Sequence, residues 1–285
     1  MSTSEDIKNK TFLITGASSG IGKAMAMQIA DAGGHVVLVC RNQGRAAEAR
    51  SEIIGAINTA VVDILVYDLS SQKSIRELSA EIHKRYQKID VLINNAGGIW
   101  GERILTEDNI EMTLAVNHLA YFMLSLLILD LLPPGGRIIN VASRAHSSAK
   151  MNFANLQGEK KYSGVAAYGE SKMANILFTY ELAERLKDRK IDVNCFHPGM
   201  VNSNWGATAH PAFKLLLLLV RPLMISASKG AETGTFLAIS ENISPRTGGY
   251  FAKEKPIKSS KLSYDREVAK KLWKLSEELT GVSHK

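Results

Sequence analysis

Cysteine is scarce in this chain, with two residues among 285. Cys40 and Cys195 both fall in stretches with the apolar pattern of strands. Two such cysteines do not form the framework of a disulfide-stapled secreted fold, so we expect a reducing compartment. The length instead suits one large domain, residues 1–285, with a sizeable hydrophobic core.

Long apolar runs are also missing. The run at residues 215–220 is far shorter than the ~20 residues that cross a bilayer. Residues 1–10 are polar and resemble neither a signal peptide nor a membrane anchor. We therefore expect a cytoplasmic protein, and peripheral contact with a membrane stays open.

No strong charge imbalance marks the sequence. It has 35 Lys and Arg against 28 Asp and Glu, which gives a formal net charge of +7. The basic residues are scattered, apart from a mild cluster toward the C-terminus, which argues against a nucleic-acid partner. A modest positive charge suits an anionic ligand or an acidic surface.

What the chain does contain begins with a strand, a glycine turn and a helix. Residues 11–15 are apolar and strand-length, and an amphipathic helix follows with Met25 and Ile29 on one face. The turn between them would let backbone N–H groups and the helix N-terminus hold a pyrophosphate. Its candidate ligand-binding residues are Gly16, Ser18, Ser19, Gly20, Ile21 and Gly22. A purely structural turn is the alternative.

The second expected strand, residues 35–40, lacks an acidic residue at its end. Dinucleotide folds that select NAD usually carry one there to bind the ribose hydroxyls. Arg41 stands in its place, and a guanidinium suits the 2′-phosphate of NADP. We predict NADP(H) as the cofactor, with Arg45 as a further contact. A solvated arginine is the alternative.

Two further strands end in polar residues. Asp68 and Leu69 follow residues 61–67 and are placed at the adenine, although Asp68 could equally cap the next helix. The apolar residues 91–93 run into Asn94, Asn95, Ala96 and Gly97. This sequence predicts a floor for the cofactor, with Asn94, Ala96 and Gly97 in contact and backbone groups tied down by amide side chains.

Tyr168 and Lys172 lie four residues apart on an amphipathic stretch and so share one face of a helix. A phenol ionises at about pH 10, too high for a good base at neutrality, and a lysine cation beside it would lower that pKa. The pair could then exchange a proton with a substrate oxygen. A tyrosine and a lysine on an ordinary helix surface are the alternative.

Two polar residues accompany this pair. Asn117 lies within a helical pattern over residues 106–131, where an asparagine is unfavourable unless it has a role or is satisfied in the core. Ser143 follows the fifth expected strand, residues 137–142, at the edge where binding and catalytic groups collect in open α/β sheets. Its hydroxyl could orient a carbonyl oxygen toward Tyr168.

In this order the motifs resemble those of the short-chain dehydrogenase/reductase family. The pattern Thr-Gly-x-x-x-Gly-x-Gly is followed by Asn-Asn-Ala-Gly, Asn117, Ser143 and Tyr-x-x-x-Lys, and the match runs from residue 10 to about residue 250. The resemblance implies an α/β Rossmann fold, a doubly wound parallel sheet in the order 3-2-1-4-5-6-7 with helices on both faces. Residues 10–200 would form its cofactor-binding and catalytic core.

The resemblance also implies roles for these residues. Tyr168 would be the acid in carbonyl reduction and the base in alcohol oxidation. Lys172 would lower its pKa and bind the nicotinamide ribose, Ser143 would polarise the carbonyl, and Asn117 would hold a water that links Lys172 to solvent. The nicotinamide carboxamide would meet Pro198, Gly199, Val201 and Ser203, which follow the sixth expected strand.

Two histidines near these positions have other interpretations. His197 precedes a proline at a strand end, which favours a structural role over a catalytic one. His146 follows Ser143 closely and could edge the substrate mouth or be an ordinary loop histidine.

A narrower resemblance is to the retinol dehydrogenase branch, which prefers NADP and acts on retinoids and other long apolar aldehydes and alcohols. It is carried by the long spacing from Ser143 to Tyr168 and by residues 117–119, 155–160, 175–179 and 197–199. Two features depart from that branch. Many members have an N-terminal anchor that residues 1–10 do not resemble, and the usual Ser-Ser pair is Ala142-Ser143 here.

The apolar stretch around residue 215 leaves three interpretations open. Residues 202–228 could form a lid over an apolar substrate pocket, residues 212–227 could touch a membrane surface, or the segment could be buried in an oligomer. Residues 262–280 present one apolar face and predict a helix docked on its own domain. Relatives commonly pair through the helices that carry Asn117 and Tyr168, so a homodimer is also left open.

The sequence thus predicts an NADP-dependent oxidoreductase that interconverts a small apolar aldehyde or ketone and its alcohol. A reductase of steroids or other bulky ketones is one alternative. A non-enzymatic NADP-sensing interaction protein is another, and the presence of all four of Asn117, Ser143, Tyr168 and Lys172 argues against it. No metal site is predicted.

Overall fold

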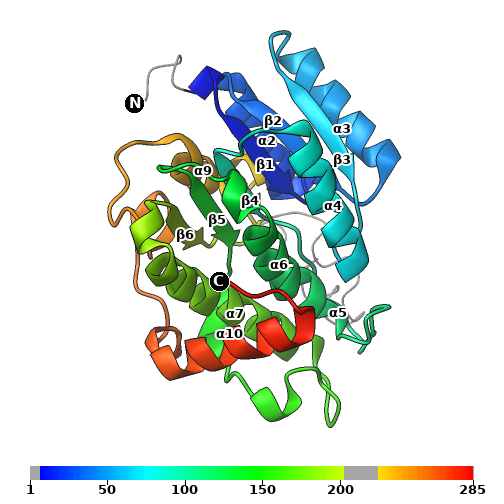
Figure 1. The fold of residues 1–285 in the computed structure, drawn as a ribbon, viewed down its shortest axis with the longest axis vertical. Coiled ribbons are helices and arrows are strands. Elements are labelled where there is room, and N and C mark those ends of the chain that lie inside the picture. Colours follow the sequence, from blue (N-terminus) through cyan, green and yellow to red (C-terminus); the bar gives the residue numbers. More distant parts are fainter. Residues whose placement is uncertain (1–6, 202–223, 285) are drawn as a thin grey trace.

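A computed structural model of the chain describes residues 7–201 and 224–284. Every strand named in it belongs to one sheet, in the order β3-β2-β1-β4-β5-β6-β7-β8 (Figure 1). Strands β1 to β7 are parallel, and β8 pairs antiparallel with β7. The predicted α/β fold and strand order are confirmed, with β8 as an added edge strand. The strands are β1 (Thr11–Thr15), β2 (His35–Cys40), β3 (Val62–Val66), β4 (Val91–Asn94), β5 (Arg137–Val141), β6 (Asp192–Phe196), β7 (Tyr250–Ala252) and β8 (Lys255–Pro256).

Helices cover both faces of the sheet because successive side chains of each strand point to opposite sides. In β1, Phe12 and Ile14 pack in the same core as α2, α3 and α9, whereas Leu13 packs in the core of α4, α6 and α7. The strands are therefore buried on both sides, as parallel sheets require. These helices are α2 (Gly20–Asp31), α3 (Gln43–Ala56), α4 (Gln72–Arg85), α6 (Ala120–Leu127), α7 (Gly164–Arg185) and α9 (Ala227–Ile239).

The helix that carries Asn117 begins later than predicted. Residues 106–111 are not helical, and α5 (Met112–Leu114) leads into a π-helical turn, η1 (Ala115–Leu119), before α6. The Glu111 carboxylate caps this start, because its two oxygens accept the N–H groups of Thr113 and Leu114, both at 2.8 Å. A π-turn adds one residue to a helical turn, and apolar spacing alone did not reveal it.

A C-terminal helix, α10 (Arg266–Thr280), packs across α7 (Figure 1). The predicted span 262–280 contains this helix and most of a short 3-10 turn, η8 (Lys261–Tyr264). The Trp273 ring lies 5.0 Å from the Phe122 ring of α6 and 6.0 Å from the Phe178 ring of α7, centroid to centroid. The apolar face of α10 is thus used within its own chain.

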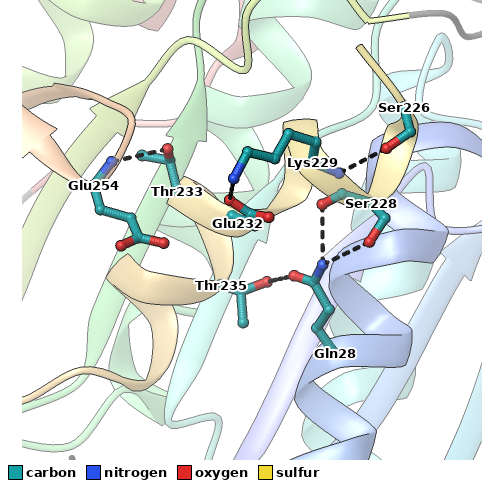
Figure 2. A network of polar contacts seen from close by, with 8 residues as sticks. All are labelled: Gln28, Ser226, Ser228, Lys229, Glu232, Thr233, Thr235 and Glu254. Carbon is teal, nitrogen blue, oxygen red and sulfur yellow. Dashed lines mark hydrogen bonds and ion pairs between the residues drawn. The ribbon is translucent and has the colours of Figure 1, made fainter.

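On the other face of the sheet, polar contacts fasten α9 to α2 (Figure 2). The Gln28 amide of α2 donates to the Ser228 carbonyl at 3.0 Å and accepts the Thr235 hydroxyl at 2.6 Å. Ser226 caps α9 by accepting the Lys229 N–H at 3.1 Å. Helix α9 is therefore fixed to α2, the helix that follows the glycine turn.

Residue Ser203 and most of the predicted lid and membrane-contact segments lie outside the described residues. Within residues 7–201 and 224–284, no helix has the length and apolarity of a membrane span. The same ranges hold no group of three His, Cys, Asp or Glu side chains that could bind a metal ion.

Candidate functional site

The parallel sheet brings the candidate residues to one edge. The glycine turn follows β1, residues 94–97 close β4, Ser143 follows β5, and Pro198 and Gly199 follow β6. Carboxyl ends of adjacent parallel strands lie side by side, and ligands bind there in open α/β folds. Helix α7 adds Tyr168 and Lys172, because it packs against β5, β6 and the turn after Ser143.

Tight packing explains the glycines of the turn after β1. Gly16 has a φ of +65°, and a Cβ on Gly22 would lie 2.5 Å from the Gly16 carbonyl oxygen. Ser19 is the N-cap of α2, but its side chain makes no capping hydrogen bond. Ser18 instead hydrogen-bonds the Cys40 thiol. The first turn of α2 therefore keeps N–H groups that no side-chain cap satisfies, which suits an anionic group.

The amides after β4 tie down the backbone, as predicted, but the two asparagines differ. Asn95 donates to the carbonyl oxygens of Thr15 and Gly16 at 2.8 and 3.2 Å, which binds the glycine turn to β4. Asn94 is fully buried and donates to Ser125 and Asn140 at 3.0 and 2.9 Å. Its side chain therefore supports the core, and its backbone lies in the ladder between β4 and β5.

The two predicted adenosine contacts have different surroundings. Arg41 is exposed at the end of β2, and no carboxylate in the described part of the chain forms an ion pair with it. Asp68 accepts the N–H and the hydroxyl of Ser70, both at 2.9 Å, while Ser71 is the N-cap of α4. Asp68 thus shapes the turn before α4 and does not cap the helix itself. Leu69 is buried beside it.

Tyr168 and Ser143 lie in direct contact, joined by a hydrogen bond between their side chains. Tyr168 is half-buried on α7, and Ser143 is the N-cap of the 3-10 turn η3 (Arg144–Ser148). Burial raises the pKa of the Tyr168 phenol to about 12, and the hydrogen bond with Ser143 opposes that rise. In the chain by itself, Lys172 is not among the groups that shift this pKa, so the expected lowering is not found.

Lys172 is almost completely buried, and its Nζ donates to the Val141 carbonyl oxygen at 3.0 Å. The same Nζ lies 5.7 Å from the centroid of the Tyr168 ring. Burial lowers the pKa of the ammonium group to about 7. Lys172 therefore lies beside Tyr168, and its charge is easily gained or lost near neutral pH.

Asn117 is fully buried in η1 and makes three hydrogen bonds. Its Oδ1 accepts the Gly98 N–H at 2.9 Å, and its Nδ2 donates to the Gly98 carbonyl oxygen at 2.9 Å and to Ser171 Oγ at 3.0 Å. Ser171 in turn donates to the Tyr168 carbonyl oxygen at 2.8 Å. The asparagine thus joins the loop after β4 to the turn of α7 that holds Tyr168.

The segment after β6 lies at the same edge. Gly199 has a φ of +89° and donates its N–H to His197 Nδ1 at 3.1 Å, which gives His197 the structural role that we favoured. Val201 is buried and pairs with Ile225 in an isolated bridge. Pro198 and Gly199 therefore follow β6 at this edge of the sheet, and Val201 is fixed there by its bridge to Ile225; their contact with the carboxamide stays a prediction.

Some contacts of this region were not predicted. Thr15 Oγ1 accepts the N–H groups of Asn95 and Ala96 at 2.8 and 3.0 Å, and Asn175 shares the Val141 carbonyl oxygen with Lys172. The only sequence signal was their nearness to the motifs. His146, which could have edged the substrate mouth, is instead buried and hydrogen-bonded on both ring nitrogens.

Comparison with known proteins gives a consistent picture. The short chain dehydrogenase family model matches residues 10–212. Retinol dehydrogenase 12 of Mus musculus is 37% identical over 282 residues, covering 98% of this chain and 89% of that protein. Among solved structures, an uncharacterized protein from Mycobacterium paratuberculosis superposes with a TM-score of 0.79 at 28% identity, covering 99% of this chain and 98% of the other.

A short chain dehydrogenase from Burkholderia cenocepacia, solved in complex with NADP, also has this fold. Its TM-score is 0.69 at 26% identity, with 86% of this chain and 96% of that chain covered. Family model, sequence relatives and solved structures agree over most of the chain. The chain therefore belongs to the short-chain dehydrogenase/reductase family of oxidoreductases, and it is similar to retinol dehydrogenases within it.

Proposed function

We propose that this chain is an NADP(H)-dependent oxidoreductase that interconverts an apolar aldehyde or ketone and its alcohol. The observation that carries the proposal is the hydrogen-bonded pair of Ser143 and Tyr168 beside the buried Lys172. A hydroxyl that polarises the carbonyl, a phenol that gives the proton and an ammonium group that stabilises the phenolate suit carbonyl reduction. The similarity to retinol dehydrogenases supports an apolar substrate.

The surroundings fit a dinucleotide. The uncapped start of α2 and the close glycine packing would hold the pyrophosphate, and the exposed Arg41 would meet a 2′-phosphate. Asp68 and Leu69 would lie at the adenine, and residues 94–97 would form the floor. Lys172 would bind the nicotinamide ribose, and Pro198, Gly199, Val201 and Ser203 would meet the carboxamide. The NADP in the Burkholderia cenocepacia relative supports this choice of cofactor. When bound, NADPH supplies the hydride.

The residues of the chain supply the proton and the orientation. With a pKa near 12, Tyr168 is protonated at neutral pH and can give its proton to the substrate oxygen as negative charge develops there. Ser143 would donate a hydrogen bond to the same oxygen and hold it toward the phenol. A charged Lys172 would stabilise the resulting phenolate, and Asn117 fixes the turn of α7 that carries both groups. In alcohol oxidation Tyr168 would act as the base.

The proposal also includes the domain, the segment at residues 202–228 and the pairing of two copies. Residues 1–285 would form one domain, and residues 202–228 would close over the substrate. Residues 212–227 would give the cytoplasmic protein its contact with a membrane surface, from which apolar substrates could enter. Pairing of two copies through the helices of Asn117 and Tyr168 would have to accommodate α10, which lies across α7.

The experiment follows the absorbance of reduced nicotinamide with NADPH and NADH against all-trans-retinal, medium-chain aldehydes and steroid ketones. We expect NADPH-dependent turnover of the long apolar aldehydes. Tyr168→Phe should abolish turnover and leave the Kd for NADPH nearly unchanged. An active Tyr168→Phe variant would remove the proposed acid, and turnover of steroid ketones alone would change the substrate class.

A further inference from the structure

His146 lies three residues after Ser143 and connects it to a distant part of the chain. Its Nδ1 lies 2.6 Å from the Ser143 carbonyl oxygen, and its Nε2 lies 3.2 Å from the backbone nitrogen of Ser260. The imidazole is 3% exposed, so water does not replace these partners. One side chain therefore joins the turn after β5 to the segment between β8 and α10.

The two partners determine where the imidazole carries its proton. A carbonyl oxygen only accepts, so Nδ1 must carry a hydrogen, and a backbone N–H only donates, so Nε2 must be unprotonated. His146 is thus neutral and protonated on Nδ1. Burial lowers its pKa, which keeps it in this form. The ring also stands edge-on to Tyr250 of β7, with 5.2 Å between centroids and an angle of 77° between planes.

The segment that contains Ser260 is itself held against α7. The hydroxyls of Ser259 and Tyr180 lie 2.8 Å apart, and the Ser259 hydroxyl lies 2.6 Å from that of Ser263. Tyr180 is on the same helix as Tyr168. The bridge through His146 therefore connects the Ser143 backbone, by way of the Ser260 segment, to α7, the helix that carries Tyr168.

We propose that His146 is a positioning residue, which fixes the Ser143 carbonyl from Nδ1 and takes the Ser260 N–H at Nε2. In this way the segment before α10 sets the direction of the Ser143 hydroxyl toward Tyr168. The inference rests on the proposed function, because orientation of Ser143 matters through the carbonyl that it polarises. A small displacement of such a group is enough to slow a reaction strongly.

A matched pair of substitutions at Ser260 isolates the bridge. Ser260→Pro removes the N–H that His146 accepts, and the Ser260 φ of −69° is one that proline adopts. Ser260→Ala removes only the hydroxyl, which has no hydrogen-bond partner among the described residues. With NADPH and all-trans-retinal, we expect Ser260→Pro to lower kcat roughly tenfold or more, with little change in KM or in the Kd for NADPH. Ser260→Ala should match the wild type.

Substitutions at His146 and Ser143 test whether the effect passes through Ser143. His146→Asn keeps an N–H donor near the Nδ1 position, so it should retain more kcat than His146→Leu. In a Ser143→Ala background, Ser260→Pro should have no further effect on kcat. An equal, additive loss in that background would overturn the inference, because the bridge would then act elsewhere.

Nitrogen-15 NMR of the histidine ring supplies a readout that does not need turnover. We expect His146 to show a protonated Nδ1 and an unprotonated Nε2, and the opposite tautomer would overturn the bridge. Equal kcat values for Ser260→Pro and Ser260→Ala would overturn the positioning role. A wild type that reduces none of the carbonyl panel would overturn the proposed function and, with it, the catalytic part of this inference, while the tautomer would still decide the bridge.

Discussion

Lys172 places a charge where the core does not favour one. Its ammonium group ordinarily has a pKa of 10.5, and burial lowers this to about 7 in the folded chain. Between these two values the unfolded chain holds more protons, so stability rises with pH across that window. The cost of burying the ammonium group is therefore largest below about pH 7, and it vanishes above the ordinary pKa.

Lys172→Met should accordingly stabilise the protein while it removes activity. We expect a gain on the order of a few kcal/mol near pH 7, shrinking toward pH 10.5. Denaturant unfolding at several pH values measures it. Lys187→Met, at an exposed position, is the control and should show no such pH dependence. A Lys172→Met variant that is less stable than the wild type at pH 7 would show that burial of this charge is compensated.

Arg41 is the residue on which the choice of cofactor depends. Because it is exposed and has no carboxylate partner in the described part of the chain, reversing its charge should disturb little of the fold. We expect Arg41→Glu to weaken NADPH binding by about 2 kcal/mol or more, because a charge-assisted contact becomes a repulsion, and to change NADH binding little. Fluorescence titration with both cofactors measures the two Kd values.

The control for net charge is Arg266→Glu, at the exposed start of α10. It changes the charge of the protein by the same amount far along the chain from β2, so it should leave the ratio of the two Kd values unchanged. Equal losses of NADPH and NADH affinity in Arg41→Glu would remove Arg41 from the 2′-phosphate site.

At the scale of elements, one aromatic side chain of α10 packs against both α6 and α7. Trp273 is 3% exposed, packs on Phe122 and Phe178, and carries the Arg185 guanidinium 4.0 Å above its ring. We expect Trp273→Ala to reduce the free energy of unfolding by about 3–5 kcal/mol, the usual cost of emptying such a site. Thermal and urea unfolding would measure the loss.

Lys274 is the neighbouring control, because its side chain is 79% exposed. Lys274→Ala should change stability by less than about 0.5 kcal/mol. A comparably small effect of Trp273→Ala would mean that α10 contributes little to the stability of the core and can separate from α7.

The sequence was most informative where a pattern is local. Strand, glycine turn and helix follow one another between residues 11 and 31, and Tyr168 and Lys172 share one helix, so their placement needed no knowledge of distant contacts. The π-turn at Asn117 escaped prediction because the residues around it stay apolar on the buried side, whatever the helical period. The elements were thus predictable in order and type, and less so in their exact bounds.

Contacts between segments that are distant in the sequence could not be predicted from the sequence pattern. His146 and Ser260 are 114 residues apart, and the Asn95 side chain meets the Thr15 carbonyl across 80 residues. Such pairs depend on which loops the sheet brings together, and on which of two neighbouring amides points outward. The sequence placed Asn94 and Asn95 side by side, but only the packing assigned one to the core and the other to the glycine turn.

For the whole molecule, buried histidines should make stability sensitive to acid. Burial lowers the pKa of His118 and of His197 from 6.5 to about 4, and it lowers the pKa of His146 as well. Between pH 6.5 and about pH 4 these histidines are protonated in the unfolded chain but not in the folded chain, so stability falls as the pH drops through this range. We expect the Tm to decline steadily from about pH 6.5 to about pH 4.

His118→Gln tests one of the two largest contributions. His118 is 1% exposed on η1, and its Nε2 lies 2.9 Å from Ser276 Oγ of α10, a contact that the glutamine amide can keep. The variant should recover up to roughly 3 kcal/mol of the free energy of unfolding that is lost near pH 4, and little above pH 7.

The opposite control is His83→Gln. The pKa of the His83 imidazole is raised by the Ser79 carbonyl and by Asp130, so protonated His83 stabilises the fold at low pH. Its removal should make stability fall more steeply as the pH drops. If both variants shifted the acid limb in the same direction, proton uptake by buried histidines would not be what limits stability in acid.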